Sequence, residues 1–350
     1  MKRIFLLLAL TAKLAAQAPG VPIFDQSKEG LKAEDQNIGA KAEKFLEEKK
    51  ALSHEEVVAE IKNPEPVEIT LAKPLERFLT AAEIAEKTAL STYRIGWAYL
   101  CKNCDHWHTN LGGGYAISAD GLIATCAHVI DHKGIDMRKG ALIAVDQAGK
   151  VYPVTKVHRY HRKMDAAIIR IDAKTTPLAL TDQVRPGDPA FCLSRPLKQG
   201  KYFSKGIVNR FFWDGGSREN EDDRSVATLA YLKMNVSSRW APGSSGSPVL
   251  DQCGNVIGHV ALINNLGKGK EKPSLITVHA AIPARSVQAL CGLGRKVEKA
   301  EKAPKEKKAP EENKAPEEEK APEEEKAPEE EKAPEEKKTP EEEKPEEATD

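Results

Sequence analysis

The sequence of 350 residues contains no run of 18 or more apolar residues. A helix that spans a bilayer needs about 20 such residues, so a membrane transporter is excluded and no membrane insertion is expected. Aromatic residues make up only 5% of the chain, and its lysines and arginines are scattered without a dense basic run. Nucleic acid is therefore not an expected partner. The composition also excludes a collagen-like fibre and a wholly disordered chain.

The formal net charge is zero, with 53 basic and 53 acidic residues, but the charge is unevenly distributed. Residues 300–350 hold 11 lysines against 21 acidic side chains, and Lys-Ala-Pro recurs every sixth residue from Lys302 to Lys332. Proline at this spacing interrupts any helix, and the segment has almost nothing apolar to bury. Residues 293–350 are predicted to be a disordered, low-complexity tail. A solvated spacer without a partner is the leading interpretation, and contact with the cell envelope is the alternative.

The first residues have the order of regions found in a secretory signal peptide. A basic start (Met1–Arg3) precedes a short apolar run (Ile4–Ala12) and the small residues Ala15 and Ala16. A buried amphipathic helix is the alternative. The first cysteine is Cys101, so no lipid-modified cysteine follows the signal. We predict a signal peptide at residues 1–16 and a secreted or periplasmic protein.

Residues 17–90 are rich in Glu, Lys and Ala, and we predict a charged, partly helical, loosely packed extension. Helical stretches are expected at Ala40–Lys50 and His54–Ile61. A third helix is expected from Thr80 to about Ala89, because Thr80 and Glu83 have the spacing of a capping box.

Residues 91–292 are predicted to form an all-β core. Short β-branched or alternating runs are separated by Gly, Pro, Asp and Asn, which is typical of a sandwich or a pair of barrels. About 200 residues suit two small barrels. The candidate strands are Tyr93–Leu100, Tyr115–Ser118, Leu142–Val145, Ala166–Ile171, Lys205–Phe211, Pro248–Leu250, Val256–Ile263 and Leu275–His279.

Three short motifs carry the residue types of nucleophilic catalysis. They are Thr-x-x-His at Thr125–His128, Asp-Ala-Ala-Ile-Ile-Arg at Asp165–Arg170, and Gly-x-Ser-Gly-x-Pro at Gly243–Pro248. A serine hydroxyl is a weak nucleophile that needs a neighbouring base. Histidine is suited to take and return its proton, and a carboxylate can fix the imidazole tautomer.

The order His, Asp, Ser resembles the chymotrypsin-like (trypsin-like) serine peptidases over about Ser91–Leu290. The motifs are most similar to the bacterial glutamyl endopeptidases and high-temperature-requirement proteases. The resemblance implies two Greek-key, six-stranded β-barrels, at about 91–175 and 176–292, with a closing C-terminal helix after Ala281-Ile282-Pro283. No PDZ domain is expected.

The same resemblance implies a role for each residue of the catalytic site. His128 would be the general base, Asp165 would orient it, and Ser245 would attack the carbonyl of a polypeptide substrate. The backbone N–H groups of Gly243 and Ser245 would form the oxyanion hole.

The specificity pocket is expected to be partly apolar. Arg239 lies six residues before the nucleophile, and Val260, Ala261 and Leu262 would form the far wall. Glutamyl endopeptidases place a histidine two residues after the strand glycine. Here His259 follows Gly258 directly, so a preference for glutamate is not carried over.

Cys101-Lys102-Asn103-Cys104-Asp105-His106-Trp107-His108 lies between two predicted strands, at the tip of a hairpin. A disulfide between Cys101 and Cys104 is the leading interpretation for an exported chain. A zinc site formed by Cys101, Cys104, His106 and His108 is the alternative, and free thiols are a third. No other cofactor is expected. Cys126 is predicted to be buried, and the pairing of the remaining cysteines (Cys192, Cys253, Cys291) stays open.

Together these features predict a secreted or periplasmic serine endopeptidase. A proteolytically inactive trypsin-fold binding or scaffold protein is the alternative, and a metal-regulated module acting through the hairpin is another.

Overall fold

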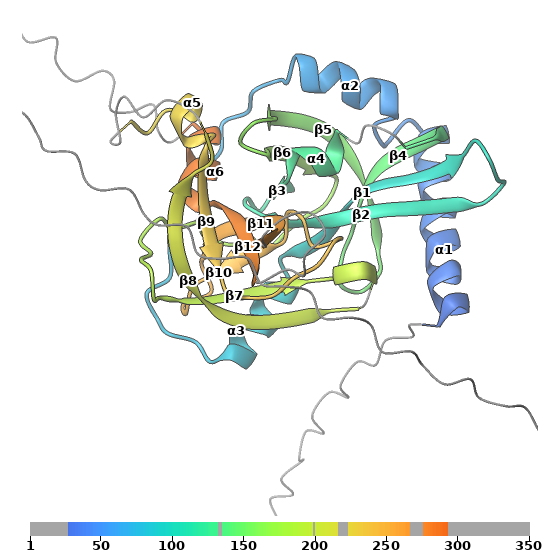
Figure 1. Ribbon diagram of the computed structural model, residues 1–350. Coiled ribbons are helices and arrows are strands. Elements are labelled where there is room, and N and C mark those ends of the chain that lie inside the picture. The colour runs from blue at the N-terminus through green and yellow to red at the C-terminus, as the bar shows by residue number, and fades with distance from the viewer. Residues whose placement is uncertain (1–26, 132–134, 199, 216–222, 267–275, 293–350) are drawn as a thin grey trace, which may run out of the picture. The chain divides into compact units, whose positions relative to one another are not determined.

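The computed structural model of the protein describes residues 27–131, 135–198, 200–215, 223–266 and 276–292. The predicted signal peptide and the predicted tail (residues 293–350) lie outside the described residues. The described part contains two closed antiparallel barrels of six strands each, with helices around them (Figure 1). The predicted all-β core of two barrels is therefore confirmed.

Barrel one has the strand order β1-β2-β3-β6-β5-β4. Its interior is filled by large apolar side chains that have almost no exposed surface, including Ile95, Trp97 and Leu142. Such alternating, β-branched and aromatic runs suit strands with one buried face. The strands are β1 (Thr92–Cys101), β2 (Trp107–Ala116), β3 (Leu122–Thr125), β4 (Met137–Val145), β5 (Val151–His161) and β6 (Ala166–Ile171).

Barrel two has the order β10-β11-β12-β9-β8-β7, and Met234 and Val249 are fully buried inside it. The register between β11 and β12 shifts between Val260 and Leu262, which marks a bulge. The strands are β7 (Pro189–Ser194), β8 (Tyr202–Trp213), β9 (Leu232–Val236), β10 (Pro248–Leu250), β11 (Val256–Leu266) and β12 (Ile276–Pro283).

Four short helical segments connect or close the barrels: α4 (Ala127–Ile130), η1 (Pro196–Lys198), α5 (Val226–Leu229) and α6 (Ala284–Leu290). Pro283 occupies the N-cap of α6, where its missing N–H costs nothing. Val287 of α6 is fully buried in the same apolar cluster as Ile282. The predicted closing helix is confirmed.

The N-terminal extension is packed against the barrels, which differs from the loose packing predicted. It forms α1 (Lys28–Glu47), α2 (His54–Lys62) and α3 (Ala81–Ala89), and the capping box of Thr80 with Glu83 is present. Ala42, Val57 and Ile84 have no exposed surface. The sequence pattern is weak because only a narrow stripe of each helix faces a barrel. None of the helices in the described ranges is both long and apolar enough to span a bilayer.

Helix α1 approaches barrel one most closely at Gly39, so we expect Gly39→Ala to loosen this contact. A Cβ atom at this position would lie 2.3 Å from Cβ and Cγ of Trp107. Alanine favours an isolated helix by about 1 kcal/mol, but this clash should reverse the sign and cost about 1–3 kcal/mol. Urea unfolding and amide hydrogen exchange of α1 test it, with Lys41→Ala on the exposed face as the control. Unchanged protection of α1 in the Gly39→Ala variant would contradict the packing.

Candidate active site

His128 and Asp165 form a bidentate pair at one end of barrel one. His128 lies in α4, directly after β3, and Asp165 precedes β6, the strand paired with β3. Nδ1 of His128 is 3.0 Å from Oδ1 and 2.8 Å from Oδ2 of Asp165, and the backbone N–H of His128 donates to Oδ1 at 3.0 Å. The His128 side chain is 50% exposed and that of Asp165 17%. The carboxylate therefore holds one edge of the imidazole while the other remains accessible.

Asp165 is ionised at neutral pH despite its burial. Burial alone would raise its pKa, but the hydrogen bonds and the positive charge that His128 can carry hold the pKa below its usual value. An ionised carboxylate accepts the Nδ1–H of His128, which fixes the tautomer and leaves Nε2 as the acceptor. The backbone of Asp165 has a φ of +63°, in the left-handed region that aspartate tolerates better than most residues.

Two buried basic side chains hold this strained backbone, and the sequence analysis missed both roles. Nε2 of His259 lies 3.3 Å from the carbonyl oxygen of Asp165. Nζ of Lys233 donates to the carbonyl of Met164 at 3.4 Å. Burial lowers the pKa of His259 to about 4, so its ring is neutral at pH 7. The sequence signal for both roles was a basic residue inside an apolar strand. This signal does not identify the hydrogen-bond partners, because they depend on how strands that are distant in sequence pack together.

The loop that carries Ser245 lies between strands of the two barrels. The N–H of Gly113 in β2 donates to the carbonyl of Ser245 at 2.6 Å, and the N–H of Gly246 donates to Val260 of β11 at 2.8 Å. Gly246 has a φ of +86°, and a Cβ there would lie 2.2 Å from the carbonyl oxygen of Gly113. Only glycine fits this position.

The same contact brings Ser245 toward His128. A Cβ on Gly112 would lie 2.7 Å from both the carbonyl oxygen of Ser245 and a methyl group of Val129, the neighbour of His128. Within the described ranges, no hydrogen bond joins the Ser245 hydroxyl to His128. Such bonds often tighten only when substrate binds. In the same ranges the N–H groups of Gly243 and Ser245 donate to no carbonyl, so both are available to a ligand.

The four residues predicted for the specificity pocket lie in different places. Ala261 and Leu262 line a cavity of about 460 Å³ together with His128 and Asp165. Arg239 lines a second cavity of about 900 Å³, next to Trp240 and His279. Val260 is buried and lines neither of these two cavities. The structure thus brings Ala261 and Leu262 to His128, whereas Arg239 lines a different cavity.

The hairpin between β1 and β2 brings three of its four candidate ligands together. The sulfur atoms of Cys101 and Cys104 are 2.8 Å apart, and Cys104 Sγ lies 3.0 Å from Nε2 of His108. The fourth candidate, His106, approaches Cys104 Sγ with its backbone carbonyl oxygen, at 4.0 Å. The hydrogen bond between the thiols lowers the pKa of Cys101 and raises that of Cys104. Two sulfurs and one imidazole would leave a zinc ion with an open fourth position, and the sulfurs alone suit a disulfide.

Residues 112–258 match the family model described as "Trypsin-like peptidase domain". Similar curated proteins include a "Putative serine protease HhoB" of Synechocystis sp., 24% identical over 162 residues, which cover 45% of this chain and 35% of that protein. A "Probable periplasmic serine endoprotease DegP-like" of Pseudomonas savastanoi is 28% identical over 152 residues, covering 43% and 28%. The chain thus spans about a third of the length of the curated relatives it matches.

Among solved structures, the serine endoprotease from Yersinia pestis is similar with a TM-score of 0.43 and 18% identity. The alignment covers 64% of this chain and 69% of that one.

For the hairpin, we expect the peptide that contains Cys101 and Cys104 to be two hydrogens lighter in non-reducing mass spectrometry. Cys101→Ser and Cys104→Ser should lower the melting temperature equally, because each breaks the same bond, and kcat should change little. The reason is that β2 reaches the Ser245 loop at Gly113, far along the strand from the hairpin. One zinc ion per chain by elemental analysis, lost in Cys104→Ser and His108→Ala, would show metal binding instead.

Burial of His259 should make the protein less stable in acid. The unfolded histidine has a pKa of 6.5 and the folded one about 4, so between these values only the unfolded state takes up a proton. The free energy of unfolding should therefore fall as the pH drops from about 6.5 to about 4. Between pH 7 and pH 5 this group should contribute a loss of about 2 kcal/mol. Urea unfolding of the wild type and His259→Gln at both values tests this. An identical pH dependence in the two proteins would rule it out.

Proposed function

We propose, because residues 112–258 match the trypsin-like peptidase domain, that the protein is a serine endopeptidase that acts through His128, Asp165 and Ser245. The observation that carries the proposal is the bidentate contact between the His128 ring and the Asp165 carboxylate, at 2.8 and 3.0 Å. A half-exposed imidazole fixed in this way is ready to act as a general base at neutral pH.

In the proposed reaction, the Ser245 hydroxyl attacks the carbonyl carbon of the scissile peptide bond while its proton moves to Nε2 of His128. The resulting imidazolium is stabilised by Asp165, which stays ionised. His128 then gives the proton to the leaving amine, and the acyl-enzyme forms. Water, deprotonated by the same imidazole, attacks the ester and releases the acid product and free Ser245.

The negative charge on the tetrahedral oxygen requires donors that are already in place. The available N–H groups of Gly243 and Ser245 support an oxyanion hole at this position. Each such donor is typically worth about 3 kcal/mol of the barrier.

Polypeptides are the proposed substrates. The cavity beside His128 has Ala261 and Leu262 in its wall together with charged side chains such as Lys163 and Asp214, which supports contacts to both apolar and polar groups of the substrate near the scissile bond. Secretion or periplasmic location is proposed from the order of basic, apolar and small residues at Met1–Ala16, and the name of the relative from Pseudomonas savastanoi supports it.

The nucleophile is tested by Ser245→Ala. Hydrolysis of fluorescently labelled casein should fall by about 10⁶-fold, to the level of the uncatalysed assay, while the melting temperature changes little. A fluorophosphonate should label the wild type at Ser245 and leave the variant unlabelled. Ser244→Ala is the matched control, because its buried hydroxyl has no hydrogen-bond partner and its removal should leave activity intact.

A wild-type protein that neither hydrolyses casein nor reacts with the fluorophosphonate would overturn the proposal. That result would favour the inactive scaffold.

A further inference from the structure

The connection between β7 and β8 touches the loop that contains the proposed oxyanion hole. The N–H of Leu197 donates to the carbonyl of Pro242 at 2.7 Å. A Cβ on Gly243 would lie 3.2 Å from the carbonyl oxygen of Arg195 and 3.4 Å from the nitrogen of Leu197. The segment Arg195–Lys198, here called the bracing segment, therefore packs directly on the Pro242–Gly243 peptide.

This hydrogen bond determines where the Gly243 N–H points. The peptide bond between Pro242 and Gly243 is trans, so its C=O and N–H groups point in opposite directions. Because Leu197 holds the carbonyl on one side, the N–H of Gly243 is directed to the other. Gly243 has a φ of +92°, and glycine rotates more freely than any other residue. Without the bond from Leu197, the peptide can turn and withdraw its N–H at low cost.

The bracing segment has an unfavourable backbone of its own. Leu197 and Lys198 have φ values of +51° and +60°, and neither is glycine. A left-handed backbone is sterically unfavourable for such residues, and it persists where surrounding contacts hold it. The Leu197 side chain is 61% exposed, so its own burial does not supply those contacts.

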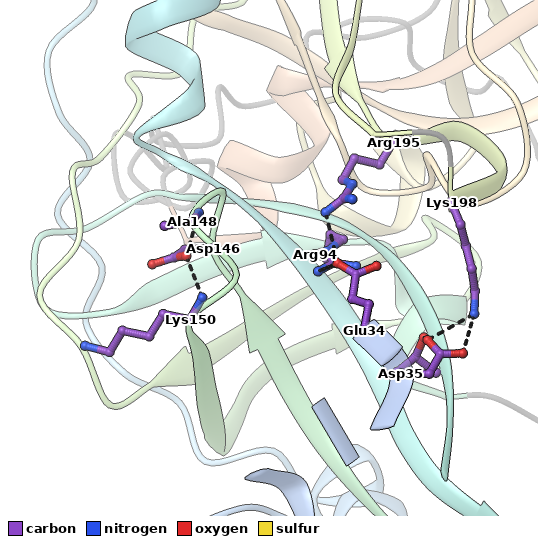
Figure 2. Close-up of polar contacts among 9 residues, drawn as sticks. Glu34, Asp35, Arg94, Asp146, Ala148, Lys150, Arg195 and Lys198 are labelled. Atoms are coloured by element: carbon purple, nitrogen blue, oxygen red, sulfur yellow. Dashed lines mark hydrogen bonds and ion pairs between the residues drawn. The ribbon is translucent and has the colours of Figure 1, made fainter. Parts of the chain in front are cut away.

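Helix α1 supplies them through two adjacent acidic residues (Figure 2). Asp35 accepts from Nζ of Lys198 at 2.8 and 3.2 Å, and from the Thr109 hydroxyl of β2 at 2.6 Å. Glu34 accepts from Nη2 of Arg94 in β1 at 2.7 Å, and the same oxygen lies 3.7 Å from Nη1 of Arg195. One helix of the extension therefore links barrel one to the bracing segment of barrel two.

The charged side chains at this link also favour the docked position of α1. The side chains of Arg94 and Arg195 are only 11% and 17% exposed, and Glu34 lies between them. Burial and the neighbouring Arg94 lower the pKa of Arg195, whereas Glu34 raises it. If α1 left, both guanidinium groups would lose the Glu34 carboxylate that lies between them, which is unfavourable for charges with so little exposure.

We propose that Glu34 and Asp35 are positioning residues of the active site, which hold the bracing segment and thereby aim the Gly243 N–H at the substrate oxyanion. This inference rests on the proposed endopeptidase function. Helix α1 is then an activating element: the enzyme is competent while residues 28–47 are docked, and release or removal of the helix switches it off.

The test compares Glu34→Gln and Asp35→Asn with Glu43→Gln in the full-length protein. Glu43 is the matched control, because it lies on the same helix and its carboxylate pairs with Lys139 of β4, which belongs to barrel one. With a peptide-amide substrate, we expect kcat to fall 10- to 100-fold in the first two variants with KM nearly unchanged. The affinity for a peptide aldehyde, which needs the oxyanion hole, should fall in parallel. Glu43→Gln should stay within twofold of the wild type in both measurements.

A double-mutant cycle identifies the route of the effect. Lys198→Met should reduce kcat about as much as Asp35→Asn, and the double variant should be no worse than either one, because all three remove the same contact. Additive losses, or losses in Glu43→Gln of the same size, would reduce α1 to a purely stabilising role and overturn the proposal.

A readout without activity separates this proposal from the enzymatic function. In the Ser245→Ala background, amide exchange of Leu197 should accelerate in Glu34→Gln and Asp35→Asn and stay unchanged in Glu43→Gln. Unchanged Leu197 protection in the first two variants would overturn the role of α1, even in an active enzyme. If the wild type is inactive but exchange of Leu197 still accelerates in Glu34→Gln and Asp35→Asn, the endopeptidase function is overturned. The contact between α1 and the bracing segment is then retained.

Discussion

The close approach of β2 to the Ser245 loop is the contact on which the candidate site depends. His128 and Asp165 belong to barrel one and Ser245 to barrel two, so the proposed triad can form only where the barrels meet. At that point the carbonyl of Ser245 accepts from Gly113, and Gly246 packs on the carbonyl of Gly113 without room for a side chain. Two backbone segments in direct contact leave less freedom for relative movement of the two barrels than a pair of flexible side chains would.

Close packing also determines the electrostatics around Asp165. Its carboxylate is satisfied by three donor contacts from His128, while its strained backbone is held through His259 and, one residue earlier, Lys233. Asp165, His259 and Lys233 are largely withdrawn from water, so the protonation state of each one depends on its neighbours. His128, the proposed general base, is thus the exposed end of a buried polar network.

The candidate catalytic residues stand out in the sequence because each lies in a short motif whose residues act locally. The strands and the Thr80 capping box were predictable for the same reason, since periodicity and caps are local signals. The roles of Lys233 and His259 were not, because their partners lie 69 and 94 residues away. The packing of α1 was missed because its buried stripe is narrow. The positions of Arg239, Val260, Ala261 and Leu262 depend on register, and the bulge between Val260 and Leu262 changes which side chains of β11 reach the cleft.

The two arginines that contact Glu34 of α1 limit how this chain can evolve. Arg94 and Arg195 come from different barrels, and a single carboxylate from outside both barrels lies between them. Loss of the helix would leave a like-charge contact inside the protein, so at least one arginine would have to change in the same lineage. Close relatives that begin at barrel one should therefore carry neutral residues at one or both of these positions. The extension and the barrels are therefore inherited as a coupled unit, because loss of the helix calls for a compensating change at a distant position in the barrels.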